Sequence, residues 1–158
     1  MLGFKVWVDA DSCPKQVREH IIKSAVRYEF EVSFVANKEI ISQEESAFCR
    51  MIVCGNGKDA ADNLIFDGAG QNDIVITKDI LFASRLVQKN ICAMNDRGFV
   101  FTKYNIQDKL MERNFNMNLS EIGFGSKNKK TYYGEKEFGK FQRSFEREVE
   151  SRSVLFPR

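Results

Sequence analysis

The chain has 158 residues, of which 43% are hydrophobic and 29% are charged, and its formal net charge is +2. This length suits one domain with a sizeable core, and the composition is that of an ordinary soluble globular protein. No apolar run approaches the length of a membrane-spanning helix and nothing resembles a signal peptide, so we expect a cytoplasmic protein. One histidine, His20, and four cysteines without C-x-x-C spacing argue against a zinc site or a disulfide framework.

The first predicted strand, over residues 5–9, and the turn after it organise the chain. An uninterrupted apolar run, Val6-Trp7-Val8, leads into Asp9-Ala10-Asp11. Such a run is typical of a central strand that is covered on both faces of a parallel sheet. Pro14 suits the first turn of a following helix. Asp9 and Asp11 are therefore expected at the carboxyl end of a strand, where open α/β sheets bind their ligands.

Strands and helices alternate through the next part of the chain. The predicted elements are a helix over 14–27, strands over 30–35 and 48–54, a helix over 58–67, a strand over 73–77, a helix beginning at Ile80, a strand over 91–94 and an extended run over 99–101. A polar loop is expected over 38–45. Short connections between alternating strands and helices predict right-handed crossovers and a mainly parallel sheet.

The C-terminal part of the chain is more basic than the rest. Residues 126–158 carry 9 basic and 5 acidic side chains, whereas residues 1–125 carry 15 and 17. We predict a helix over 105–114, a polar loop over 123–134 and a final helix over 135–151 whose phenylalanines dock on the body. The basic balance is compatible with phosphate contacts, although a solvated amphipathic helix is the simpler interpretation.

Acidic and amide side chains recur where strands end or helices begin. They are Asp9 and Asp11, then Asp59, Asp62 and Asn63, then Asp79, and finally Asn95 and Asp96. Neighbouring carboxylates raise one another's pKa unless a cation neutralises them. Oxygen ligands without histidine or thiolate favour Mg²⁺ or Mn²⁺, which activate water and stabilise charge on a phosphodiester. If the first and fourth strands are neighbours, Asp9 and Asp79 lie together, and this pair is the strongest candidate.

Each of these residues also has a structural interpretation. Asp11 and Asp79 could cap helices, Asp59 could complement a helix dipole, and Asp96 could be a turn residue. Asp9 is harder to explain in this way, because a charge at the end of a buried strand is unfavourable. Three basic residues near the same edge, Lys58, Lys78 and Arg97, are candidates for binding the phosphates of a substrate, together with Asn95.

Several segments resemble the signature blocks of the YaiI/YqxD family of bacterial proteins. They are Trp7-Val8-Asp9-Ala10-Asp11-Ser12-Cys13-Pro14, Val35-Ala36-Asn37, Asp59-Ala60-Ala61-Asp62-Asn63, the run from Asp73 to Ile80, and Asn95-Asp96-Arg97-Gly98. That family is grouped with PIN-like nuclease domains. The resemblance covers roughly residues 4–115 and implies a three-layer α/β fold whose mainly parallel five-stranded sheet has the order 3-2-1-4-5. The loop and helix of residues 116–158 would complete a single domain over 1–158.

The resemblance also implies a set of site residues. Metal positions match Asp9, Asp62 and Asp79, with Asp11 and either Asn95 or Asp96 in support. Lys58-Asp59 together with Asp62 is similar to the related NYN nucleases. The chain departs from the family pattern at Ser12, where alanine is usual, at Asp96, where proline is usual, and around 123–126, where the family has a glycine-glycine-proline stretch.

Three functions are compatible with the sequence. The first is a nuclease that acts on RNA with Mg²⁺ or Mn²⁺ and uses Asp9, Asp11, Asp62 and Asp79. The second is a non-catalytic module that binds RNA or a protein. The third is a HAD-like phosphatase with Asp9 as nucleophile and Asp11 as acid/base. Cys13 at a helix N-terminus is a further, weaker candidate for a nucleophile.

Overall fold

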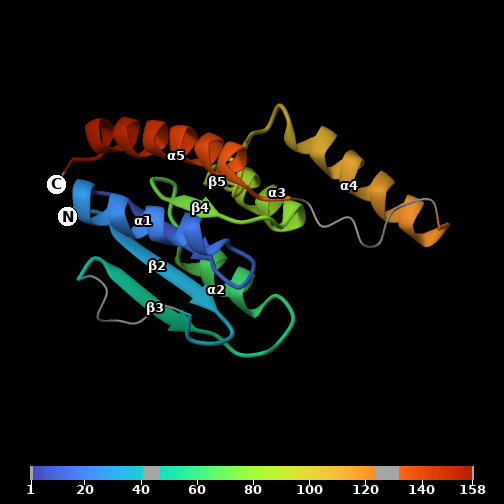
Figure 1. Cartoon of the computed structure of the whole chain (residues 1–158), viewed down its shortest axis with the longest axis horizontal. Coiled ribbons are helices and arrows are strands. Elements are labelled where there is room, and N and C mark those ends of the chain that lie inside the picture. Colours follow the sequence, from blue (N-terminus) through green and yellow to red (C-terminus); the bar gives the residue numbers. More distant parts are fainter. Residues whose placement is uncertain (1, 41–46, 124–131, 158) are drawn as a thin grey trace.

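A computed structural model of the chain describes residues 2–40, 47–123 and 132–157 (Figure 1). The strands are β1 (Lys5–Asp9), β2 (Glu31–Ala36), β3 (Cys49–Val53), β4 (Ile74–Ile76), β5 (Cys92–Met94) and β6 (Val100–Phe101). The helices are α1 (Lys15–Tyr28), α2 (Ala60–Gly68), α3 (Ile80–Gln88), α4 (Ile106–Glu121) and α5 (Glu135–Leu155). In this described part of the chain, no helix is both long enough and apolar enough to cross a membrane.

β1 lies at the centre of the sheet, between β2 and β4. The strand order is β3-β2-β1-β4-β5-β6, and every pair is parallel except β5 with β6. The predicted order 3-2-1-4-5 is therefore confirmed, and the extended run predicted over 99–101 adds a short antiparallel strand. Because β1 and β4 are neighbours, the residues that follow them reach the same edge of the sheet.

Side chains alternate between the two faces of the sheet, and helices cover both faces. In β1, Val6 and Val8 pack in a core with α1 and α5, whereas Trp7 packs in a second core with α2 and α3. Phe141 and Phe145 of α5 are fully buried in the first core, which confirms the predicted docking of the last helix. The same alternation directs Asp9 toward the α2 and α3 side.

The fourth helix is longer than predicted. The expected end at Asn114 is wrong, because α4 continues to Glu121. No glycine or proline interrupts the helix between Ile106 and Gly123, whose φ is +83°. Ile106 is the one buried residue of α4, Leu110 packs against the second core, and the C-terminal part of the helix projects from the body (Figure 1). The predicted loops over 38–45 and 123–134 lie largely outside the described residues.

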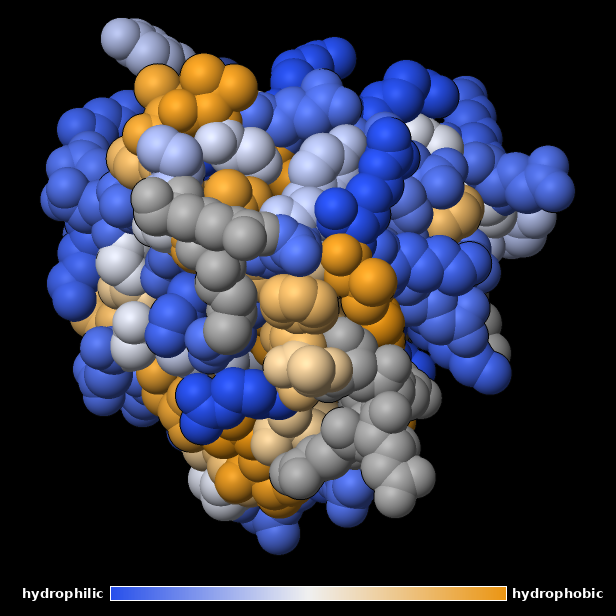
Figure 2. Space-filling model, turned by 90° about the vertical axis from the view of Figure 1, so that its left-hand side faces the viewer, coloured by the Kyte–Doolittle hydropathy of each residue, from blue (hydrophilic) through white to orange (hydrophobic). Residues whose placement is uncertain are grey.

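A buried carboxylate holds the amino edge of the sheet together. Asp73, just before β4, accepts hydrogen bonds from the Lys5 amide at 2.8 Å, the Trp7 indole at 3.1 Å and the Gly70 amide at 2.9 Å. Figure 2 views the end of the molecule that carries both termini, where hydrophobic surface is interspersed among hydrophilic side chains. The strands point away from this end, so their carboxyl ends lie on the far side.

Candidate functional site

Asp9 ends β1 on the side of the sheet that α2 and α3 cover. Its Oδ2 accepts a hydrogen bond from the hydroxyl of Thr77 at 3.2 Å. The parallel register of β1 and β4, which pairs Val8 with Ile76, brings these two strand ends side by side. The strand pairing therefore places Asp9 next to the segment that carries Asp79, as the sequence predicted for neighbouring strands.

A pocket of about 220 Å³ lies at this edge, and four carboxylates line it. They are Asp11 from the turn after β1, Asp59 and Asp62 from the start of α2, and Asp79 from the start of α3. No lysine or arginine is among the described residues that line this pocket, which we call the acidic pocket. It brings three of the predicted site aspartates together, beside Asp9.

The carboxylates of this site act on one another electrostatically. Burial is the main reason why the pKa of Asp9 is raised, and the charges of Asp11 and Asp79 raise it further, against the hydrogen bond from Thr77. Burial also raises the pKa of Asp62 from 3.8 to about 6, with contributions from Asp9 and Asp79. Negative charge at this edge is therefore poorly compensated by the protein.

Two of the site aspartates also have structural roles. Asp79 caps α3, because its Oδ1 accepts a hydrogen bond from the amide of Phe82 at 3.2 Å. Asp11 accepts from the amide of Asn37 at 3.1 Å and so links the turn after β1 to the end of β2. These bonds orient the two carboxyl groups, so a structural role and a place in the acidic pocket are compatible.

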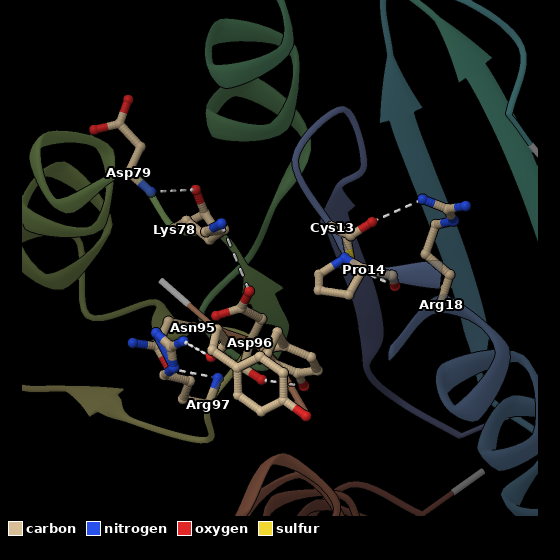
Figure 3. A network of polar contacts seen from close by, with 11 residues as sticks. Cys13, Pro14, Arg18, Lys78, Asp79, Asn95, Asp96 and Arg97 are labelled. Atoms are coloured by element: carbon tan, nitrogen blue, oxygen red, sulfur yellow. Dashed lines mark hydrogen bonds and ion pairs between the residues drawn. The ribbon is translucent and has the colours of Figure 1, made fainter. Parts of the chain in front are cut away.

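The predicted basic and amide residues lie elsewhere along the same edge. Lys78 pairs with the buried Asp96, with Nζ 3.8 Å from Oδ2, and the carboxylate of Asp79 points away from this pair (Figure 3). Asn95 is a turn residue whose Oδ1 accepts from the amides of Arg97 and Phe99. The predicted phosphate ligands Lys78, Asn95 and Arg97 thus form a group apart from the acidic pocket.

Lys58 is exposed and is not among the residues that line the acidic pocket. Burial raises the pKa of the Cys13 thiol to about 12, which disfavours the thiolate that a nucleophile requires. Tyr133 was not predicted, yet its hydroxyl donates to the carbonyl of Asp96 at 2.6 Å. Its position just before the last helix carries no local signal for a contact with a residue 37 positions earlier.

The donor chemistry of the acidic pocket fits a hard divalent cation, since every charged ligand is a carboxylate. Among the described residues, however, no three acidic, histidine or cysteine side chains already stand close enough together to hold a metal ion. A cation would therefore require the carboxylates of Asp9, Asp62 and Asp79 to move closer together.

Comparison with known proteins places the chain in a family. The sequence model described as "Uncharacterized BCR, YaiI/YqxD family" matches residues 7–151. The chain belongs to the YaiI/YqxD family. A UPF0178 protein of Treponema denticola is similar, with 39% identity over 137 residues that cover 87% of this chain and 86% of the relative.

A second similar UPF0178 protein, from Syntrophobacter fumaroxidans, is 36% identical over 151 residues, which are 96% of this chain and 97% of that relative. A third, from Pseudomonas putida, is 37% identical over 146 residues, which are 90% of this chain and 94% of the relative. No solved structure matches the chain. The resemblance of the signature segments to the YaiI/YqxD family is thus confirmed, whereas the family's description assigns no activity.

Proposed function

We propose that this YaiI/YqxD protein is a nuclease that hydrolyses RNA phosphodiesters with Mg²⁺ or Mn²⁺. The observation that carries the proposal is the gathering of Asp9, Asp11, Asp62 and Asp79 at one strand edge, where burial and mutual repulsion raise two of their pKa values. A divalent cation relieves such repulsion, and a bound one lowers the pKa of water and stabilises charge on phosphorus.

The site residues would have different roles. Asp9, Asp62 and Asp79 would hold the cation, and the hydrogen bonds from Thr77 and Phe82 would orient Asp9 and Asp79. Asp62 is buried beside the charges of Asp9 and Asp79, and a bound cation would offset this repulsion and keep its carboxylate ionised. Asp11 would support the site from the turn after β1.

The test is cleavage of fluorescent single-stranded RNA in Mg²⁺ or Mn²⁺, with EDTA as the blank. We expect Asp9→Asn to reduce cleavage by at least about a hundredfold, an effect on the order of one lost electrostatic contact in a transition state. Asp67→Asn is the matched control, because Asp67 is an exposed carboxylate on α2, and it should change the rate less than about twofold.

Cation binding is measured separately by titration calorimetry with Mn²⁺. We expect Asp9→Asn and Asp62→Asn to weaken it and Asp67→Asn to leave it unchanged. If neither RNA nor DNA is cleaved under either metal while RNA is still bound, the proposal is wrong and a non-catalytic binding module is favoured. Trapping an aspartyl-phosphate on Asp9 would favour a phosphatase instead.

A further inference from the structure

A second hollow lies on the α5 side of the same edge, and its charged walls are basic. This cavity of about 430 Å³ lies between the turn over 95–98 and α5. The charged side chains that line it are Arg97, Lys109, Lys140, Arg143 and Arg147. No carboxylate is among the described residues lining this cavity, which we call the basic cleft.

The sequence of α5 builds one wall of the basic cleft. Phe141 and Phe145 fix the helix against the sheet, which leaves Lys140, Arg143 and Arg147 in a row at i, i+3 and i+7. At a rise of ~1.5 Å per residue, this row is about 10 Å long. A single phosphate group cannot contact both ends of it, so its length suits a chain of phosphates.

The turn after β5 builds the opposite wall and touches α5 directly. Gly98 has a φ of +76°, and a Cβ there would lie 2.5 Å from the carbonyl oxygen of Lys140 and 2.7 Å from the hydroxyl oxygen of Ser144. The Nη2 of Arg97 donates to the carbonyl of Tyr132 at 2.9 Å. Arg97 is therefore held at the mouth of the cleft rather than free in solvent.

Two acidic residues of α5 are engaged away from the basic cleft. Glu146 lies 3.7 Å from the Nε2 of His20, and Glu150 accepts a hydrogen bond from the Tyr28 hydroxyl at 3.1 Å, both on the α1 side. Among the described residues, none of the α5 cations in the basic cleft forms an ion pair. Lys140, Arg143 and Arg147 are therefore not neutralised by ion pairs with the described carboxylates of α5.

A third cavity adjoins the basic cleft and reaches the segment that carries Asp79. This adjoining cavity of about 610 Å³ shares Arg97 and Lys109 with the basic cleft. At its other end it is lined by Lys78 and Ile80, the residues on either side of Asp79 in the acidic pocket. Acidic pocket, adjoining cavity and basic cleft therefore follow one another along the carboxyl edge of the sheet.

The adjoining cavity also has an apolar wall. Ile80, Phe101 and Met117 line it beside cations and three carboxylates, of which Asp96 pairs with Lys78 and Glu112 pairs with Lys109. Single-stranded nucleic acids bind in grooves that combine cations along the backbone with apolar or aromatic surface for the bases. The chemistry of the two cavities matches this combination better than it matches a free phosphate, which has no apolar part.

We propose that the basic cleft binds the phosphate backbone of single-stranded RNA, to one side of the phosphodiester bond that would be cleaved at the acidic pocket. The naming of RNA as a substrate rests on the proposed function, but binding itself requires neither a cation nor cleavage. Each phosphate contact with a single strand adds ~0.7 to the slope of log affinity against log salt. The cleft thus predicts a salt dependence that changes when its cations are removed.

The test is fluorescence anisotropy of a labelled oligouridine with the full chain in EDTA, over a range of salt concentrations. We expect Arg143→Gln with Arg147→Gln to reduce the salt slope by about 1.4 and the affinity by roughly tenfold or more. Lys23→Gln with Arg27→Gln removes the same charge from α1 and should preserve both. Arg143→Lys with Arg147→Lys keeps the charges and should retain the slope.

The inference is overturned if the α1 and α5 glutamine pairs have equal effects, if the slope is unchanged, or if excess inorganic phosphate displaces the RNA as readily as an unlabelled oligomer does. RNA binding that depends on α5 without any cleavage supports the cleft and contradicts the nuclease. Metal-dependent cleavage with unaltered binding in the α5 glutamine pair supports the nuclease and contradicts the cleft.

Discussion

At the amino edge of the sheet, Asp73 receives three N–H donors, from Lys5, Trp7 and Gly70. At the carboxyl edge, the one hydrogen-bond donor to Asp9 among the described residues is the Thr77 hydroxyl, and two further carboxylates raise its pKa. Both carboxylates flank central strands of the same sheet. The protein compensates the charge at one edge and leaves it uncompensated at the other, and uncompensated charge is what a cation site requires.

The same chemical change at the two edges should therefore have opposite effects on stability. Asp73→Asn places an amide NH₂ among three donors and weakens charge-assisted hydrogen bonds, so we expect a loss of about 3 kcal/mol in the free energy of unfolding. Asp9→Asn removes a charge that burial disfavours, so we expect a gain of about 0.5–1 kcal/mol in the absence of divalent cations. Urea unfolding near neutral pH in EDTA measures both. Effects of the same sign would contradict the comparison.

The carboxyl edge also has a rigid part, the turn that touches α5. Gly98→Ala should lower stability by about 2–3 kcal/mol, because the methyl group meets backbone at 2.5 Å and φ is +76°. Gly123→Ala is the matched control, since φ there is +83° and nothing lies within 4 Å of the added Cβ. We expect that variant to lose only about 1 kcal/mol. Thermal unfolding distinguishes the two, and equal losses would show that the contact with α5 contributes nothing.

The sequence predicts the strands, but it does not show which edge of the sheet carries a structural carboxylate and which carries the candidate site. Asp73 and Asp79 both flank β4, and no local pattern says that one is structural. The difference arises from contacts with Lys5 and Trp7, which are 68 and 66 residues away in the chain. Asp9 could be selected from the sequence because an apolar run leads directly into it, and that run is a local feature.

The acidic pocket was more predictable than the basic cleft, because it follows from strand order and not from a contact between distant segments. Parallel strands bring their carboxyl ends together whatever the loops do, so Asp9 and Asp79 follow from strand order alone. The basic cleft instead depends on the approach of Gly98 to α5, a contact between two segments joined by a long and partly undescribed stretch. The spacing of Lys140, Arg143 and Arg147 can be read from the sequence, but the part of the molecule that these side chains face cannot.

The smallest expected effect concerns the pH dependence of stability. The pKa of Asp62 is about 6 in the folded chain against an ordinary value of 3.8, so between about pH 4 and 6 the folded state binds more protons than the unfolded state. Stability should therefore fall as the pH rises through this window, and the full penalty should apply above it. The raised pKa corresponds to a loss of at most about 3 kcal/mol in the free energy of unfolding. Solvent screening reduces this loss to about 1 kcal/mol.

Asp62→Asn should flatten this window, and the difference between the two proteins isolates Asp62. His20 titrates in a neighbouring range, and burial lowers its pKa, but it lies in the other helix layer and contributes equally to both proteins. Above pH 6, saturating Mg²⁺ should stabilise the unaltered chain more than the variant, because the ion binds the charged carboxylate of the folded state. If Mg²⁺ shifts both equally, Asp62 is no cation ligand.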